Sequence, residues 1–356
     1  MIEMTAERVP PDHTDDVSVQ RWTAMSRFFA TSLGAIIIVL FFVPLVMSDN
    51  VMQQLTSLFI LVILAVMWNA LAGYGGLVSV GQQAFIGLGA YGAIYLGHVH
   101  AVTPLLALLL SALIAGAVAI PVALVMLQLR GGAFAIGTWV VAEVFAIVVS
   151  LRSDLGAGTG ISFIEMNRFE LHSRIQYVYW ASLGTAAVLL IALFVLLRSR
   201  LGASLQAIRD DEGAAASVGV RVMAGKPILF VLAGLGCGAA GALTLANQLF
   251  IQPTSIFSVD YSALMIFMVL VGGLGTFDGP IIGAIVLFII QNQLGDNGVW
   301  YFILLGSVAI AFALVLPRGL MGTLQDRLGL QLLPIGYRLR GVERAQEERQ
   351  SVNVTT

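Results

Sequence analysis

Two glycine patterns in this sequence have the spacing that binds dinucleotides in soluble enzymes. Gly87 to Gly92 reads G-x-G-x-x-G, and the spacing recurs at Gly236 to Gly241. A dinucleotide loop follows a strand, opens a helix and is trailed by an acid about 20 residues later. Residues 107–117 hold only Ala, Leu, Ser, Ile and Gly, and both patterns lie in apolar runs. We therefore expect no bound cofactor, and no ATP site, in this chain.

Other reactive residues are too few to form a catalytic or metal centre. His98 and His100 form an H-x-H pair, but a zinc site needs three or four ligands and nothing nearby completes the set. The single cysteine, Cys237, excludes an internal disulfide and a cysteine-based zinc cage. Neither H-E-x-x-H nor G-x-S-x-G occurs. The sequence predicts no metal site, no catalytic residues and no enzymatic activity.

Glu143 is the one acid well inside an apolar run. A charged residue at the centre of a membrane helix costs about 2.5–3.5 kcal/mol on insertion scales. Glu143 must therefore face a partner helix, a cavity or water, or be protonated. A hydrogen bond to a neighbouring subunit and a role in conduction both remain open. The amides Asn69, Asn247 and Gln248 and the 291–293 cluster lie near the ends of apolar runs, where we expect them to be solvated.

Composition decides the class of protein. The chain is 58% hydrophobic and 11% charged, with a mean hydropathy of +0.93. A soluble domain carries about 25% charged residues, so this chain cannot cover a water-facing surface. Its net charge of −2, without a basic patch, gives no indication of nucleic-acid binding. The sequence predicts an integral membrane protein in contact with the lipid bilayer.

The apolar runs predict an all-α polytopic protein of about ten transmembrane segments, because a bilayer core needs about 20 apolar residues per helix. The expected spans are 28–47, 53–72, 83–97, 103–128, 131–150, 177–197, 227–247, 262–274, 279–294 and 299–316. Residues 1–27 are mostly polar and precede a full-length span, so they predict a flexible cytoplasmic arm and no cleavable signal.

The distribution of Arg and Lys predicts the orientation. Ten spans put fifteen of these residues on the side of the N-terminus and only three, Arg152, Arg168 and Arg174, on the other. Cytoplasmic loops carry the excess of positive charge. We expect a transmembrane domain over 28–316, a periplasmic loop at 151–176, a cytoplasmic loop at 198–226 and a cytoplasmic tail at 317–356, with both termini in the cytoplasm.

Two glycine-rich interruptions indicate weak internal symmetry. Residues 73–92 have a counterpart at 272–280, and each precedes a short apolar span. Paired Gly/Pro interruptions of this kind indicate a transporter's pathway. Glycine also allows close helix packing, and both roles remain open here. The residues expected to line a pathway are Gly75, Gly76, Ser79, Gln82, Gln83, Phe85, Glu143, Gly273 and Gly275.

The predicted cytoplasmic loop contains an amphipathic segment. Leu201, Leu205 and Ile208 fall on one helical face, a charged block follows at 209–212, and three alanines precede Gly219, which is expected to end the helix. Small residues let another protein approach closely, so the segment is suited to docking. An ordinary interfacial helix is the alternative.

Several motifs, in order along residues 55–322, resemble one known family. They are the glycine-rich stretch at 69–92, LRGGAFAIGTWVVAEVF at 129–145, SRLGASLQAIRDDEGAAASVG at 199–219, VLVGGLGTFDGP at 269–280 and the LPRGLMG run that ends at Gly322. Together they are similar to the permease subunits of ABC importers for branched-chain amino acids, and in particular to the LivM type. Gly213 departs from the resemblance, since many relatives carry a large aliphatic residue before the alanine pair.

The resemblance implies a bacterial inner-membrane importer made of several chains. Its partners would be a second, LivH-type permease subunit, two cytoplasmic ABC ATPases that bind ATP and Mg, and a periplasmic amino-acid-binding protein. The coupling residues would be Ser204, Leu205, Ile208, Arg209, Asp210, Asp211, Glu212, Ala214, Ala215 and Gly219. Permeases for urea and short amides share the resemblance and remain an alternative, as does a self-sufficient secondary transporter.

Overall fold

A computed structural model describes residues 18–20, 24–217, 219, 222–295, 298–328 and 338–340. The ten longer helices within these residues are α1 (Ala24–Phe42), α2 (Asp49–Asn69), α3 (Gln83–His98), α4 (Pro104–Met126), α5 (Gly132–Ser150), α6 (Leu171–Arg198), α9 (Val222–Gln248), α11 (Asp260–Gly272), α12 (Gly279–Leu294) and α13 (Val299–Val315). The shorter ones are α7 (Arg200–Asp210), α8 (Glu212–Ser217), α10 (Pro253–Ile256) and α14 (Gly319–Leu328).

Other elements are short. The π-helical turn η3 (Ala70–Tyr74) continues α2, and 3-10 turns form η2 (Val43–Leu45), η4 (Ser153–Leu155) and η5 (Ile164–Arg168). Strand β2 (Ile161–Ser162) pairs antiparallel with β3 (Phe250–Ile251), with Ile161 opposite Ile251. Strand β1 (Ser18–Gln20) pairs antiparallel with β4 (Arg338–Arg340), which joins segments near the two chain ends.

Each predicted span contains one helix, and the class of all-α membrane protein is confirmed. Seven helical segments of the described chain are long and apolar enough to cross a bilayer, so the count of about ten spans is not confirmed. The three helices not counted are α3 and α12, which have only 16 residues each, and α1, whose searched apolar part is the short segment Gly34–Leu45. Helix α1 begins at Ala24 and α6 at Leu171, both earlier than expected. The predictions for residues 1–17 and 341–356 lie outside the described residues.

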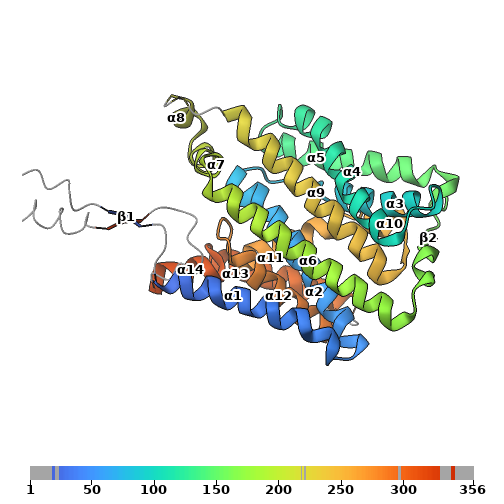
Figure 1. Cartoon of the computed structure of the whole chain (residues 1–356). Coiled ribbons are helices and arrows are strands. Elements are labelled where there is room, and N and C mark those ends of the chain that lie inside the picture. Colours follow the sequence, from blue (N-terminus) through green and yellow to red (C-terminus); the bar gives the residue numbers. More distant parts are fainter. Residues whose placement is uncertain are drawn as a thin grey trace, which may run out of the picture.

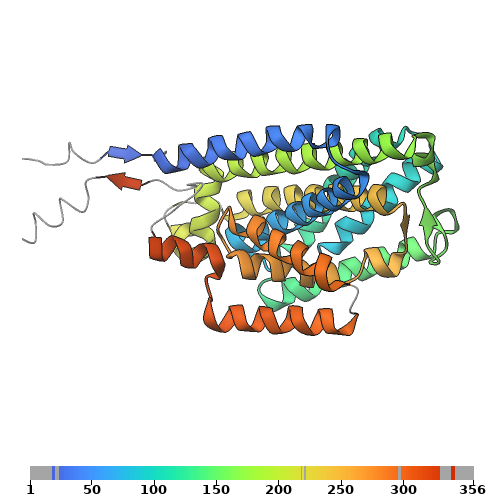
Figure 2. The same ribbon diagram turned by 90° about the horizontal axis from the view of Figure 1, so that it is seen from below.

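The long helices form one bundle with two distinct ends (Figures 1 and 2). Helices α7, α8 and α14 lie at one end, called here the α7 end, and β2 lies at the other, called the β2 end. Strands β1 and β4 extend beyond the α7 end.

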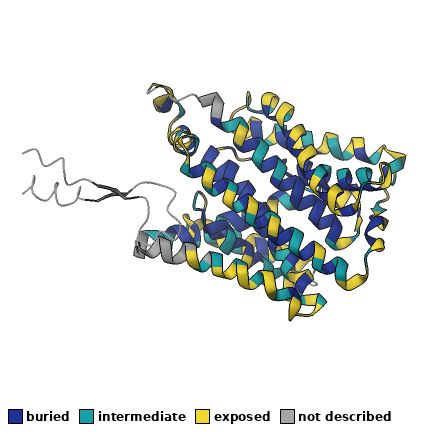
Figure 3. Cartoon of the chain, viewed as in Figure 1, coloured by how far each residue is buried: buried dark blue, intermediate teal, exposed yellow. Residues whose placement is uncertain are grey.

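Helices α2 and α9 form the centre of the bundle. Helix α9 packs against α2, α3 and α4, and α2 also packs against α6 and α12. Both are largely buried, whereas α4, α5, α6 and α13 expose many large apolar side chains (Figure 3). Exposed apolar faces around a closed core are the arrangement that a lipid solvent requires.

The two G-x-G-x-x-G patterns pack against each other. One lies in α3 and the other in α9, and a Cβ on Gly89 would overlap the carbonyl group of Gly238. A Cβ on Gly241 would likewise overlap the carbonyl group of Ile86. Glycine at these positions lets the two backbones touch, as in other membrane helix pairs. In this part of the glycine-rich run, close helix packing is the role of the glycines.

Candidate functional site

The two glycine-rich interruptions meet at the α7 end of the bundle. The first runs from η3 through residues 75–82, and the second joins α11 to α12 at residues 273–278. Gly73 packs on Gly275 so closely that a Cβ on Gly73 would lie 2.7 Å from the Gly275 nitrogen. Gly273 and Gly275 have φ values of 129° and 76°, which L-residues with a side chain rarely adopt. The weak symmetry of the sequence therefore corresponds to a physical contact between the breaks.

Asn69, at the end of α2, holds the two breaks together. Its Oδ1 accepts a hydrogen bond of 2.9 Å from the Gly275 nitrogen. Its Nδ2 donates one of 2.9 Å to the carbonyl oxygen of Thr276. The side chain is 1% exposed, so the expectation that Asn69 is solvated is wrong. Sequence reasoning missed this role because the partners are more than 200 residues away.

Arg209 connects the predicted coupling helix to the breaks. Its Nη1 donates a hydrogen bond of 2.7 Å to the carbonyl oxygen of Gly73. A Cβ on Gly275 would lie 3.0 Å from the same Nη1, and one on Gly76 would lie 3.7 Å from the Arg209 Cα. The Nε and Nη2 atoms donate to Asp210, at 3.0 and 2.8 Å. One side chain of α7 thus contacts both interruptions, including two predicted pathway glycines, Gly76 and Gly275.

The remaining residues of the coupling segment follow the predicted amphipathic pattern. Leu205 and Ile208 lie on the buried face of α7. The Ser204 hydroxyl donates to the Arg200 carbonyl, one turn earlier in the same helix. The Oδ1 atom of Asp211 accepts from the Ala214 nitrogen at 2.9 Å, which starts the short helix α8. In α8, Ala215 is buried and Ala214 exposed; Gly219 follows, exposed, with a φ of 84°.

Glu212 ties α8 to two other elements. It pairs with Lys226 of α9 at 3.1 Å and with Arg130, in the α4–α5 connection, at 3.5 Å. These three side chains, with Gly76 and Val78, line a cleft of about 590 Å³ at the α7 end. The coupling segment and the first break therefore share one surface-accessible cleft.

The polar residues of the first break are buried. Ser79, Gln82 and Gln83 are 0% exposed. The Ser79 carbonyl accepts from Trp68 Nε1 at 2.9 Å, and Gln83 Oε1 accepts from the Ser262 hydroxyl of α11 at 2.6 Å. Within the described chain no donor reaches Gln82 Oε1.

Two further neighbours fix the first break. The Val80 nitrogen donates to Thr138 Oγ1 of α5 at 3.3 Å, and a Cβ on Gly81 would overlap the Thr138 carbonyl. Phe85 is 1% exposed and packs edge-on against Phe230 of α9, with ring centroids 5.7 Å apart. Helices α2 and α5 thus hold the break itself, and α9 and α11 hold the first turn of α3 that follows it.

Glu143 lies on an exposed face of α5, away from the breaks. Its Oε1 accepts a hydrogen bond of 3.1 Å from Trp139 Nε1, one turn earlier. The surrounding side chains on this face are exposed and apolar. Both interpretations of Glu143, subunit contact and conduction, agree with this exposure.

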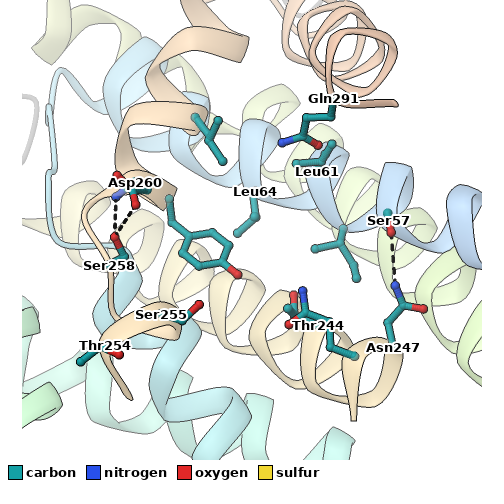
Figure 4. A pocket seen from close by; sticks show the side chains of 14 residues that line it. Ser57, Leu61, Leu64, Thr244, Asn247, Thr254, Ser255, Ser258, Asp260 and Gln291 are labelled. Carbon is teal, nitrogen blue, oxygen red and sulfur yellow. Dashed lines mark hydrogen bonds between the residues drawn. The ribbon is translucent and has the colours of Figure 1, made fainter. Parts of the chain in front are cut away.

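A pocket of about 360 Å³ opens between α2, α9, α11 and α12 in the β2-end half of the bundle (Figure 4). Ser57 and Asn247 hydrogen bond at 3.2 Å on one side, and Ser258 and Asp260 at 2.8 Å on another. Leu61, Leu64 and Leu264 supply apolar walls. The pocket combines amide and hydroxyl groups with one carboxylate and an aliphatic surface.

Asp260 of this pocket was not singled out from the sequence. It falls two residues before the predicted span 262–274, outside the apolar run. Helix α11 starts at Asp260 and has 13 residues, about 20 Å at 1.5 Å per residue. Asp260 is therefore the first residue of a short apolar helix.

Among the described residues, three contacts between a basic side chain and a carboxylate lie at the β2 end, one of them between His172 and Asp49 at 2.6 Å. His98 contacts Glu165 at 3.2 Å, and Arg152 contacts Asp154 at 2.7 Å. The hydrogen bonds from Arg152 lower the pKa of the Asp154 carboxyl below its ordinary value, so this carboxylate stays charged. The carboxylate neighbour of His98 is Glu165. No cluster of three metal-ligating side chains occurs among the residues that the structure describes.

Comparison with known proteins identifies the family. Residues 50–317 match the family model described as branched-chain amino acid transport system / permease component. The chain is 26% identical to the high-affinity branched-chain amino acid transport system permease protein LivM of Escherichia coli (strain K12) over 81% of this chain and 74% of the relative. It is 25% identical to LivM of Salmonella typhimurium (strain LT2) over 84% and 76%.

A shorter similarity joins the chain to sugar permeases. It is 31% identical to the ribose import permease protein RbsC of Escherichia coli (strain K12) over 36% of this chain and 42% of the relative. No solved structure matches. The family match covers most of the bundle, including both breaks and α7, and the chain belongs to the family of branched-chain amino acid transport permease components.

Proposed function

We propose that this chain is one membrane permease subunit of an ATP-driven importer for branched-chain or related amino acids. A second, homologous permease chain completes the pathway, two ATPases supply the motion, and a periplasmic binding protein delivers the solute. The family match and the LivM relatives support this proposal. ATP and Mg belong to the ATPase subunits, and this chain contributes the pathway and the coupling surface.

The α7 end faces the cytoplasm of a bacterial inner membrane in this proposal. Fifteen of the 18 Arg and Lys residues fall on that side in the ten-span arrangement. The pairing of β1 with β4 beyond the α7 end is consistent with both termini being there. The β2 end, with the pocket of Figure 4 in its half of the bundle, then faces the binding protein.

The observation that carries the proposal is the contact of Arg209 with both breaks. Arg209 belongs to α7, and Leu205 and Ile208 pack the same helix against the bundle. An ATPase that displaces α7 and α8 therefore moves this guanidinium. A shift of α7 therefore changes the hydrogen bond to Gly73 and the packing against Gly275 together. The exposed small residues Gly213, Ala214 and Ala216 leave room for a docking groove on α8.

The chemistry of the pocket in Figure 4 suits an aliphatic amino acid. The carboxylate of Asp260 can pair with an ammonium group, and the amide of Asn247 can donate to a carboxylate. Leu61 and Leu64 offer an aliphatic wall to the side chain. Urea and short amides lack the ammonium group, so they make less use of Asp260.

Reconstitution tests the proposal. We expect uptake of leucine, isoleucine or valine into vesicles only when this chain, a second permease, the ATPases, ATP and the binding protein are all present. Full uptake by this chain alone would refute the importer. Uptake that collapses with the proton gradient and ignores ATP depletion would instead establish a secondary transporter, and uptake of urea alone would replace the solute.

A further inference from the structure

The cleft at the α7 end combines positive charge with apolar walls. Its volume is about 590 Å³, within the range of about 300–1,000 Å³ that small-molecule pockets occupy. Arg130 and Lys226 bring cationic groups to it, and Glu212 is the one acid among the described residues that line it. Most of the other lining side chains are apolar, namely Leu77, Val78, Leu127, Leu129, Phe134 and Ala135. The cleft therefore suits a ligand with an anionic part and an apolar part.

The charges in the cleft are not balanced. One carboxylate, that of Glu212, faces two cations. Lys226 is largely buried, with 16% of its side chain exposed, and lies 3.1 Å from this carboxylate. Arg130 is 87% exposed and lies 3.5 Å from it. An exposed pair of that length contributes little, because water and salt screen it. The guanidinium of Arg130 is thus free to bind a second anion while Lys226 stays paired.

The apolar walls of the cleft continue into the outer surface of the bundle. Leu124 and Val125, in the last turns of α4, are exposed just before the cleft, and Ile136 is exposed in the first turns of α5. Val78 and Leu129 are exposed within the cleft itself. Exposed apolar residues of this kind face lipid in a membrane protein. The cleft therefore joins a surface suited to acyl chains to a cation at the end of that surface.

A free anion would use only part of this arrangement. Inorganic phosphate would pair with Arg130 and leave Val78 and Leu129 exposed. An acidic side chain of a docking protein would likewise contact the cation and leave the apolar walls uncovered. A phospholipid supplies both parts, since its phosphate and its acyl chains are covalently joined.

We propose that this cleft binds a phospholipid of the cytoplasmic leaflet with an anionic headgroup. The headgroup phosphate pairs with Arg130, and one acyl chain lies along Val78 and Leu129. Basic pockets on the cytoplasmic side of transmembrane helices are suited to anionic headgroups. The cytoplasmic position of the α7 end comes from the proposed function, whereas binding of the lipid does not depend on the transported solute.

The bound lipid contacts two parts that the proposed function sets in motion. Gly76 and Val78 of the first break line the cleft, and so does Glu212 of α8. A phosphate that draws Arg130 away from Glu212 removes the contact between α8 and the α4–α5 connection, while the pair of Glu212 with Lys226 remains. The lipid therefore lies where the coupling segment meets the first break.

Native mass spectrometry of the purified full-length chain tests the site by counting the lipids that remain bound. We expect phosphatidylglycerol, whose headgroup is anionic, to be retained over phosphatidylcholine, whose headgroup has no net charge. Arg130→Gln should weaken phosphatidylglycerol binding about fivefold, which is the contribution of one basic residue near an anionic lipid surface. The matched control is Arg200→Gln, an exposed arginine of α7 that does not line the cleft. Equal retention of the two lipids, or equal weakening by both variants, would overturn the site.

Substitution of the competing carboxylate gives a change in the opposite direction. Glu212→Gln leaves two cations in the cleft without an acid, so phosphatidylglycerol should bind more tightly than to the wild-type chain. A purely structural role of the Arg130–Glu212 contact predicts no such gain. Unchanged or weaker binding by Glu212→Gln would show that the carboxylate and the phosphate do not compete for Arg130, and the assigned headgroup position would be wrong.

Two further measurements separate the lipid from other occupants. Inorganic phosphate, added at constant ionic strength, should leave phosphatidylglycerol bound; complete displacement would assign the cleft to a free anion instead. Phosphatidylglycerol should also copurify with the assembled transporter, and its exclusion on assembly would show that a protein covers the cleft. A transporter that runs on ATP and shows no preference for phosphatidylglycerol would disprove the lipid site alone. Retention of this lipid by a chain whose uptake ignores ATP would refute the proposed function alone.

Discussion

The guanidinium of Arg209 donates a hydrogen bond of 2.7 Å to the carbonyl oxygen of Gly73, across 136 positions of sequence. Gly73 in turn packs on Gly275, so the end of α7 and both glycine breaks form one contact group. This relationship gives the coupling proposal its most direct tests.

Removing the guanidinium should separate ATP hydrolysis from uptake. A hydrogen bond from a charged donor contributes about 1.5–3 kcal/mol, so Arg209→Ala should lower solute uptake per ATP hydrolysed about tenfold or more. Arg209→Lys keeps the charge without the fork of donors and should give an intermediate value. Both rates are measured in the same reconstituted vesicles. Normal uptake by Arg209→Ala would contradict the coupling role.

Adding one methyl group at Gly73 should disturb the contact between the breaks. The new Cβ of Gly73→Ala would overlap Asn69 Oδ1 and crowd the Gly275 backbone. Overpacking of this kind costs about 1–3 kcal/mol, so the melting temperature of the purified chain should fall. The control is Gly184→Ala in α6, where nothing lies within 4 Å of the added Cβ. Equal melting temperatures for the two variants would show that the contact is loose.

A variant that keeps one of the two Asn69 hydrogen bonds should be more stable than a variant that loses both. Asn69→Leu leaves the Gly275 nitrogen and the Thr276 oxygen without partners, and each unsatisfied buried group costs about 1–3 kcal/mol. Asn69→Asp retains the acceptor for Gly275. We expect thermal stability and uptake to decrease in the order wild type, Asn69→Asp, Asn69→Leu. An unaltered Asn69→Leu variant would exclude this role.

Reversing charge in the coupling segment should be rescued by a second reversal. Glu212→Lys places a cation beside Lys226 and Arg130 and should lower coupled uptake several-fold while leaving insertion intact. In the double variant Glu212→Lys with Lys226→Glu, the pair is restored in the opposite sense. Recovery of uptake by the double variant, measured against both single variants, would establish the pairing. Failure to recover would instead assign the effect to Glu212 alone.

Asp260 should affect the solute and not the coupling. Asp260→Asn removes the one carboxylate that lines the pocket of Figure 4, so the apparent KM for amino-acid uptake should rise about tenfold. ATP hydrolysed per solute transported should change little at saturation. The control is Ser150→Ala, since that hydroxyl only donates to the Ala146 carbonyl of its own helix. An unchanged KM would remove the pocket from the pathway.

Hydrophobic runs predicted the positions of the ten longer helices, but not the short helices α10 and α14. Each expected span contains a helix, and the bounds of 279–294 agree to the residue. The early start of α6 at Leu171 was missed because Arg174 and its polar neighbours mask the helix in a hydropathy pattern. The amphipathic spacing of Leu205 and Ile208 correctly predicted the buried face of α7.

The contacts between distant segments could not be predicted. Nothing local to Asn69 or Gly73 indicates that residues 273–278 lie beside them, because that contact depends on how α2 and α11 pack. Asp260 could not be singled out for a related reason: the pocket that it lines is formed with residues of α2, α9 and α12, which are distant in sequence. The sequence indicated where glycine-rich segments interrupt the helices. Tertiary packing determines which side chains hold these interruptions in place.

The glycine seam between α3 and α9 has a mechanical consequence. Where two backbones touch at Gly89 and Gly238 there is no layer of side chains to change rotamer, so the pair has little freedom to slide or splay. We expect α3 and α9 to move together as one rigid body. When α7 is displaced, the pair would then rotate about the two breaks. Bending elsewhere along α3 or α9 would absorb little of this movement.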